Sequence, residues 1–235
     1  MLRHAIGDIR GDALLARDGA IGSVADLYFD DERWTVRYLV VDTGKWLPGR
    51  KVLISPASVA RDQPNADEIR VALTREQIKN APSIDDDPPI SRTLEAAHAH
   101  YYNHPYYWTG PYLWGPAPLP IAAQPVEPVP YADLRAADDA RATAEQRASE
   151  SHVRSSREVI GYKIRAADGD IGHVEDFVID DVSWEIADMI VDTRNWLPGK
   201  KVLVPPSGIS DIDWADRRVT VRLTRAELEK APVSA

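Results

Sequence analysis

The 235-residue sequence contains no cysteine. Structural disulfides, thiolate zinc sites, iron–sulfur clusters and a cysteine nucleophile are therefore excluded. No apolar run approaches the roughly 20 residues that a membrane-spanning helix needs. The first five residues, Met1-Leu2-Arg3-His4-Ala5, lead straight into charged sequence, which is not the pattern of a signal peptide. We therefore expect a cytoplasmic protein without an integral membrane segment, and the periphery of the inner membrane is a second expected location.

The chain contains fewer basic residues than acidic residues. The chain has 28 Lys and Arg against 37 Asp and Glu, a formal net charge of −9. Residues 1–82 are neutral overall, whereas the segments 83–157 and 158–235 are both acidic. No segment therefore offers a basic track for phosphates, and we expect no direct binding to nucleic acid. Hydrophobic residues make up 44% of the chain, which is enough for one or two globular cores.

The sequence contains a tandem repeat with a constant offset of 150 residues. Residues 8–82 and 158–232 align without a gap and share 28 identities over 75 positions. The paired stretches include Asp18-Gly19 with Asp168-Gly169, Asp30-Asp31 with Asp180-Asp181, Trp46-Leu47-Pro48-Gly49 with Trp196-Leu197-Pro198-Gly199, and Leu73-Thr74-Arg75 with Leu223-Thr224-Arg225. One ancestral unit has therefore been duplicated, with a long insert between the copies.

Each copy has the pattern of short β-strands. Asp-Gly between apolar stretches predicts a hairpin, and Ile21 to Phe29 then reads as a strand. In the next strand Trp34, Val36, Tyr38 and Val40 share one face, whereas Thr35 and Arg37 face away from it. Two further strands are expected, one at 52–54 and one at 69–73.

Each copy ends in the start of a short helix. Thr74 with Gln77, and Thr224 with Glu227, fit the capping-box pattern, and a proline at 82 or 232 limits the helix length. We therefore predict an all-β fold with two small barrels, each of five or six strands and a short terminal helix. Closed or nearly closed barrels leave few exposed strand edges. The predicted domains are 1–82 and 158–235.

The insert, residues 83–157, is a linker rich in proline and aromatic residues. Ten of the 18 prolines of the chain lie in it, and many favour extended backbone. Alanines repeat every four residues from Ala132 to Ala148, which predicts an Ala-rich helix at 132–149 that is marginal unless it docks.

Three histidines of the insert, His98, His100 and His104, lie within seven residues and are candidate metal ligands. No single regular conformation brings all three together, and a metal site also needs a further ligand and supporting contacts. We therefore favour polar linker histidines and predict neither a metal nor a cofactor.

The aromatic residues of the insert crowd into residues 101–114. They suit either a docking patch for another protein or a segment that folds back onto one of the barrels, and a quinone or pigment pocket is a third reading. Trp46 and Trp196 either plug a barrel end or project toward a partner. The candidate interaction anchors are Trp46, Leu47, Trp196, Leu197, Tyr106, Tyr107 and Trp108.

The aspartates that recur in both copies are Asp30, Asp31, Asp42, Asp180, Asp181 and Asp192. Paired carboxylates suit acid–base chemistry or a cation site. We favour turn formation, because Asp side chains accept hydrogen bonds from nearby backbone N–H groups in tight turns. His173, close to Asp176, is read as half of a surface pair on a strand.

The stretches Asp168-Gly169-Asp170-Ile171-Gly172 and Ile190-Val191-Asp192-Thr193, with Trp196-Leu197-Pro198-Gly199 after them, resemble the PRC-barrel family. The first copy carries the same pattern. The family includes the C-terminal domain of the photosynthetic reaction-centre H subunit and that of the ribosome maturation factor. The two-copy layout is similar to that of uncharacterised bacterial tandem PRC-barrel proteins. The resemblance implies a small β-barrel used as a docking module and implies no catalytic residue.

We therefore expect a non-enzymatic adaptor or scaffold that binds other proteins through its barrels and its aromatic insert. The two copies are expected to pair within one chain as a pseudo-dimer, or between chains as a homodimer. Two alternatives come from the resemblance alone. One is a membrane-associated accessory factor of photosynthetic electron transport, and the other is a protein-binding module of RNA processing or ribosome maturation.

Overall fold

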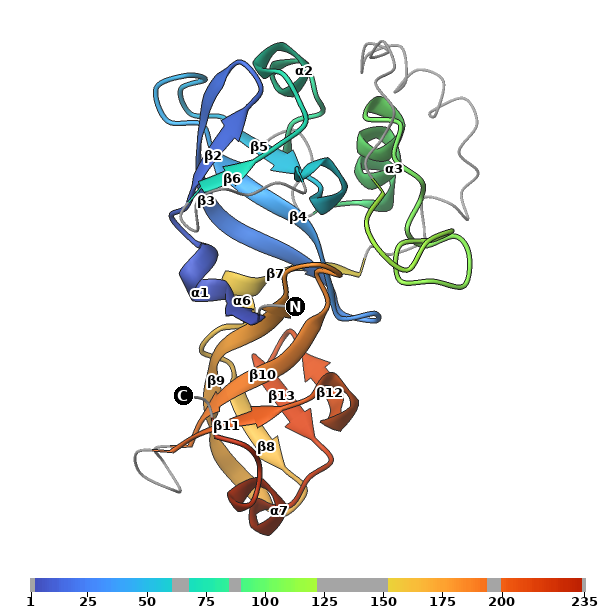
Figure 1. Ribbon diagram of the computed structural model, residues 1–235. Coiled ribbons are helices and arrows are strands. Elements are labelled where there is room, and N and C mark those ends of the chain that lie inside the picture. The colour runs from blue at the N-terminus through green and yellow to red at the C-terminus, as the bar shows by residue number, and fades with distance from the viewer. Residues whose placement is uncertain (1–2, 61–67, 85–89, 122–151, 194–199, 234–235) are drawn as a thin grey trace. The chain divides into compact units, whose positions relative to one another are not determined.

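The computed structural model describes residues 3–60, 68–84, 90–121, 152–193 and 200–233. The chain divides into two compact units, and each contains one copy of the repeat. The repeat-1 unit is formed by residues 9–154, and the repeat-2 unit by residues 1–8 and 155–235. In Figure 1 the strands of the first copy run from blue to cyan, and those of the second copy are orange to red.

The repeat-1 unit is built on a six-stranded sheet with the path β5-β4-β3-β2-β6, to which β7 adds by pairing with β3. Its strands are β2 (Ala13–Ala16), β3 (Gly19–Asp30), β4 (Thr35–Asp42), β5 (Lys51–Ile54), β6 (Glu68–Arg70) and β7 (Val153–Ser155). Its helices are α2 (Arg75–Lys79), α3 (Arg92–Tyr101) and the single 3-10 turn η1 (Pro56–Ser58).

The repeat-2 unit has a similar plan on a seven-stranded sheet, with the additional strand β12; the path is β11-β10-β9-β8-β13-β12, and β1 pairs with β9. Its strands are β1 (Arg3–Ala5), β8 (Lys163–Ala166), β9 (Gly169–Asp180), β10 (Ile186–Asp192), β11 (Lys201–Val204), β12 (Ile209–Asp213) and β13 (Arg218–Val221). Its helices are α6 (Ser156–Val159), the 3-10 turn η3 (Pro206–Gly208) and α7 (Arg225–Glu229), and α1 (Ile6–Ile9) follows β1.

The predicted all-β architecture of two duplicated units is confirmed. Within the described ranges, neither strand path closes back on itself. The predicted hairpin is present, since β2 and β3 pair around Arg17 and Asp18. Both capping boxes are also present, with Thr74 and Thr224 each accepting a hydrogen bond from the N3 backbone.

The glycine at the end of each hairpin marks a close approach between neighbouring strands. Gly22 and Gly172 both have φ of 158°. A Cβ at these positions would lie 1.9 Å from the carbonyl oxygen of Asp42 and 1.8 Å from that of Asp192, respectively. Only glycine fits, so the same backbone contact fixes β3 against β4 and β9 against β10.

Strand β4 is buried on both faces from Thr35 to Val41. Arg37, whose side chain points away from the face of Val36 and Tyr38 in the sequence pattern, is 1% exposed and among the largest fully buried side chains. A β-bulge at this point, where Tyr38 faces Tyr28 and Val36 faces Phe29, breaks the expected alternation. Arg37 and Tyr38 are both covered by residues of the insert, as the contacts described below show.

The short strand that precedes each copy is exchanged between the two sheets. Strand β1, at the start of the first copy, pairs antiparallel with β9 of the second copy, with His4 opposite Ile179. Strand β7, at the start of the second copy, pairs with β3 of the first copy. Equivalent side chains meet in both places: His4 lies 3.8 Å from Asp181, and Arg154 lies 3.3 Å from Asp31. Each sheet is therefore completed by a strand that the sequence places in the other copy.

Candidate functional site

Residues 90–121, which we call the docked segment, pack on the sheet of the repeat-1 unit. Helix α3 begins at Ser91, whose side chain accepts a hydrogen bond from the N–H of Leu94. One face of α3 is buried, and His98 contacts the sheet through Nε2, which lies 2.9 Å from the carbonyl oxygen of Leu53 on β5. Tyr101 donates a hydrogen bond to the carbonyl oxygen of Gln77 in α2.

The buried Arg37 is the centre of this packing. Its Nη2 lies 3.0 Å from Oδ2 of Asp30, and its Nη1 donates to the carbonyl oxygen of Leu113 at 2.8 Å. The guanidinium carbon is 3.8 Å from the ring centre of Tyr107 and 4.9 Å from that of Trp114. Burial lowers the pKa of Arg37, while Asp30 and Tyr107 oppose this shift. A paired, hydrogen-bonded and ring-stacked guanidinium is the form in which a buried cation is tolerated.

A second polar group lies next to this centre. Tyr107 donates a hydrogen bond to Glu95 on α3, and Nη1 of Arg92 lies 3.3 Å from the other oxygen of Glu95. Burial raises the pKa of the Tyr107 phenol well above its usual value. Tyr107 is 6% exposed, so this candidate anchor holds the segment to its own unit. The sequence left open whether the aromatic cluster docks on a partner or folds back, and for Tyr107 and Trp114 the structure selects folding back.

The three candidate metal ligands of the insert do not come together. His98 is buried against Leu53, His104 lies 3.3 Å from the hydroxyl of Ser58, and His100 is exposed. Tyr102 packs against the rings of both His98 and His104. Burial lowers the pKa of His98 to about 4, so the ring is neutral at physiological pH. His98 is therefore a packing residue of the docked segment.

A small cavity lies beneath the docked segment, with Arg37, Tyr38, His98, His104 and Trp114 in its wall. Its volume of about 20 Å³ is room for about one water molecule. An organic ligand of the size of a quinone does not fit this cavity.

The outer side of the docked segment carries exposed apolar side chains. Six large hydrophobic side chains are exposed among the described residues, and four of them belong to this segment. They are Tyr106, Tyr112, Leu119 and Ile121, which are 37%, 52%, 40% and 45% exposed. The half-buried Trp108 stacks on Tyr106, with ring centres 4.8 Å apart, and Arg92 lies over its ring at 4.4 Å. We call Tyr106, Trp108, Tyr112, Leu119 and Ile121 the aromatic surface.

The tryptophan loop of the first copy forms a second exposed feature. Its turn is held by the hydroxyl of Thr43, which donates toward the carbonyl oxygens of Leu47 and Arg50. Trp46 is half-buried, 4.8 Å beneath the guanidinium of Arg75, and lines an open cup of about 460 Å³ together with residues of α2. The equivalent candidates Trp196 and Leu197 lie outside the described residues.

Several of the recurring aspartates form turns, as predicted. Oδ1 of Asp30 accepts hydrogen bonds from the N–H groups of residues 32 and 33, and Asp180 does the same for residues 182 and 183. Asp42 accepts from the N–H of Gly44 in the tryptophan loop. Asp192 and His173 have different neighbours and are discussed below.

No helix in the part of the chain that the structure describes is both long and apolar enough to cross a membrane. A search among curated proteins found no similar chain. The family model for the PRC-barrel domain matches residues 1–78 and again residues 152–228, which together are more than half of the chain. Each match begins with the exchanged strand of its own copy. The chain therefore belongs to the PRC-barrel domain family, with two copies of the domain.

Proposed function

We propose that this protein is a non-enzymatic adaptor that binds another protein through the aromatic surface of the docked segment. The observation that carries the proposal is the concentration of exposed apolar side chains there. Four of the six large exposed hydrophobic side chains among the described residues lie within residues 106–121. A segment of a folded protein that exposes several large apolar side chains is a candidate interaction site.

The contacts that hold the docked segment on the sheet also favour binding, because they keep the exposed side chains ordered. The segment is tied to the sheet through Arg37, Asp30 and the buried ring of Tyr107, so the outward residues stand on a packed base. Trp108 is held between Tyr106 and Arg92. An ordered aromatic side chain loses little conformational entropy on binding, and Trp and Tyr are the residues that most often dominate interface energies.

The family supports the same class of function. PRC-barrel domains serve as protein-interaction modules, and the resemblance carries no catalytic residue to this chain. The tryptophan loop supplies a second contact in this proposal, because Trp46 lines an open cup beside α2. In this proposal a single partner protein contacts both the aromatic surface and the tryptophan loop.

The test is site-specific photo-crosslinking in the native host, with a photoreactive phenylalanine analogue at Tyr112. Val182, which is 42% exposed and lies in the other unit, is the matched control position. We expect one discrete protein adduct from position 112 and none of that mass from position 182. Absence of an adduct at position 112, or the same set of adducts at both positions, would contradict the proposal.

The second step uses the captured partner in purified form. Trp108→Ala should weaken its binding by roughly 30-fold or more, since an interface hot spot is worth at least about 2 kcal/mol. Val182→Ala should leave the affinity unchanged. Circular dichroism of both variants establishes that the fold is retained before the affinities are compared.

A further inference from the structure

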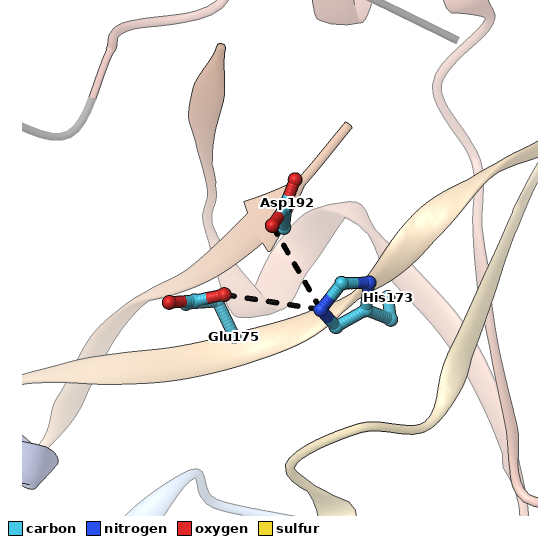
Figure 2. Close-up of side chains that lie close together, drawn as sticks. All are labelled: His173, Glu175 and Asp192. Atoms are coloured by element: carbon cyan, nitrogen blue, oxygen red, sulfur yellow. Dashed lines mark ion pairs between the residues drawn. The ribbon is translucent and has the colours of Figure 1, made fainter. Parts of the chain in front are cut away.

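Three side chains with metal-binding atoms gather on the sheet of the repeat-2 unit. They are His173 and Glu175 on β9 and Asp192 at the end of β10 (Figure 2). Nε2 of His173 lies 3.8 Å from Oε2 of Glu175 and 3.9 Å from Oδ2 of Asp192. One ligand atom from each of the three lies within 4.8 Å of the others. No other group of three such residues is this compact in the ranges that the structure describes.

The strands hold these side chains in place. Asp192 is directly opposite His173 in the antiparallel register of β9 and β10. The register then shifts, since Val191 faces Val174 and Ile190 faces Asp176, so Glu175 is the extra residue of a β-bulge. His173 and Glu175 are two residues apart on β9 and therefore lie on the same face of the sheet, where the carboxylate comes within reach of the imidazole. Sites built on strands hold their geometry better than sites on loops.

The three side chains of this cluster differ in their exposure to solvent. The side chain of Asp192 is 2% exposed, whereas those of His173 and Glu175 are 35% and 31% exposed. Lys201 donates a hydrogen bond to Oε1 of Glu175 at 2.9 Å, which leaves Oε2 directed at the histidine. The two carboxylates and this ammonium together carry a net negative charge, which favours an incoming dication.

One imidazole nitrogen and two carboxylate oxygens are a donor set for a first-row divalent ion. Zn²⁺ binds such donors at about 2.0–2.2 Å, so its ligand atoms stand about 3.4 Å apart in a tetrahedron. The two separations from the imidazole, 3.8 and 3.9 Å, need to close by about half an ångström. The two carboxylate oxygens, which lie within 4.8 Å of each other, need to approach by up to about 1.4 Å. Three protein ligands leave a position for water or for a group from a binding partner.

The first copy provides an internal comparison. The positions equivalent to His173, Glu175 and Asp192 are Ser23, Ala25 and Asp42. The bulge is present there too, because Val41 faces Val24 and Val40 faces Asp26. Asp42 is exposed and accepts a hydrogen bond from the N–H of Gly44. The same backbone therefore carries two additional ligand-type side chains only in the second copy, around an aspartate that is buried there.

We propose that His173, Glu175 and Asp192 bind one divalent first-row transition-metal ion, with Zn²⁺ as the probe. The ion replaces the two long contacts of His173 with direct coordination by all three side chains. It joins β9 to the end of β10.

The test is calorimetric titration of the full-length, chelator-treated protein with Zn²⁺. The key variant is H173S/E175A, which gives the second copy the residues that the first copy already carries on the same backbone, so the fold is expected to tolerate it. His100→Ser, which removes an exposed histidine elsewhere in the chain, is the control. Circular dichroism of all three proteins checks the fold.

We expect a 1:1 site in the unmodified protein and in His100→Ser. In H173S/E175A the affinity should fall by more than about 100-fold, because loss of a supporting residue alone costs 10- to 100-fold. Co²⁺ offers a second readout, since its visible d–d absorption should appear in the unmodified protein and be missing in the double variant. The proposal is overturned if no ion binds the unmodified protein, or if H173S/E175A binds Zn²⁺ as tightly.

Discussion

The two copies share one backbone plan but differ in what lies on their sheets. In the first copy Arg37 and Tyr38 are buried beneath the docked segment. The second copy has Ala187 and Asp188 at these positions, and both are only half-buried. The aspartate at the turn that precedes these positions is present in both copies, but Asp30 binds Arg37, whereas Asp180 binds Ser183. The hairpins and the capping boxes are common to both copies, whereas residues at equivalent strand positions differ in chemistry and in burial.

The largest expected change in stability comes from replacing Arg37, which has no equivalent in the second copy. Arg37→Ala leaves Asp30 without its buried counter-ion and removes the donor to Leu113. We expect the free energy of unfolding to fall by about 3–5 kcal/mol, as is usual when one partner of a buried ion pair is removed. Urea unfolding followed by circular dichroism measures this change.

The control for this prediction is Arg165→Ala, an exposed arginine on β8 of the second copy. Its substitution should change stability by less than about 0.5 kcal/mol. A loss of similar size in both variants would mean that Arg37 does not secure the docked segment.

The next effect is a pH dependence that comes from a buried histidine of the docked segment. Burial lowers the pKa of His98 to about 4, from an ordinary value of 6.5. The unfolded chain therefore binds a proton at His98 between pH 6.5 and 4, whereas the folded chain does not, so stability falls as the pH decreases through this window. The contribution of His98 amounts to about 3 kcal/mol at its lower end.

Thermal unfolding of the unmodified protein and of His98→Gln at pH 7.5, 6 and 4.5 tests this dependence. The glutamine keeps a donor near the carbonyl oxygen of Leu53 but does not titrate. The difference in melting temperature between the two proteins should shrink or reverse on acidification. Parallel pH profiles would show that His98 has an ordinary pKa in the folded state.

The smallest effect tests what the two copies have in common. Thr74→Ala and Thr224→Ala each remove an N-cap in a complete capping box. Each substitution should cost about 1 kcal/mol, the typical value for an N-cap. Chemical denaturation of the two variants should give values that agree to within about 0.5 kcal/mol. A clear inequality would mean that α2 and α7 contribute differently to their units.

The parts of the fold that depend on neighbouring residues were predictable from the sequence. The Asp18-Gly19 hairpin and the Thr74–Gln77 capping box each follow from interactions within a few residues. The exchange of β1 and β7 was not predictable, because residues 3–5 and 153–155 occupy the same place in the repeat and either sheet could accept either strand. In a duplicated sequence, the strand patterns of the two copies do not determine which sheet each of these strands joins; the segments that connect the copies do.

The sites were only partly predictable, for a similar reason. From the sequence, Arg37 was predicted to face away from the core side of its strand. The residues near it give no sign that the rings of Tyr107 and Trp114, some 70 residues later, pack against its guanidinium. His173 was paired in the sequence reading with Asp176, whose side chain instead accepts from the N–H of Gly7. The neighbours of His173 depend on the bulge at Glu175 and on the register with Asp192, which are both long-range properties.

The exchanged strands have a consequence for how the protein is synthesised. The ribosome delivers β3 long before β7, with about 120 residues between them, so at ~5–20 residues per second the first sheet waits roughly 6–25 s for its last strand. Strand β1 waits longer still for β9. During this interval the nascent chain presents unpaired strand edges, which are templates for pairing with other chains.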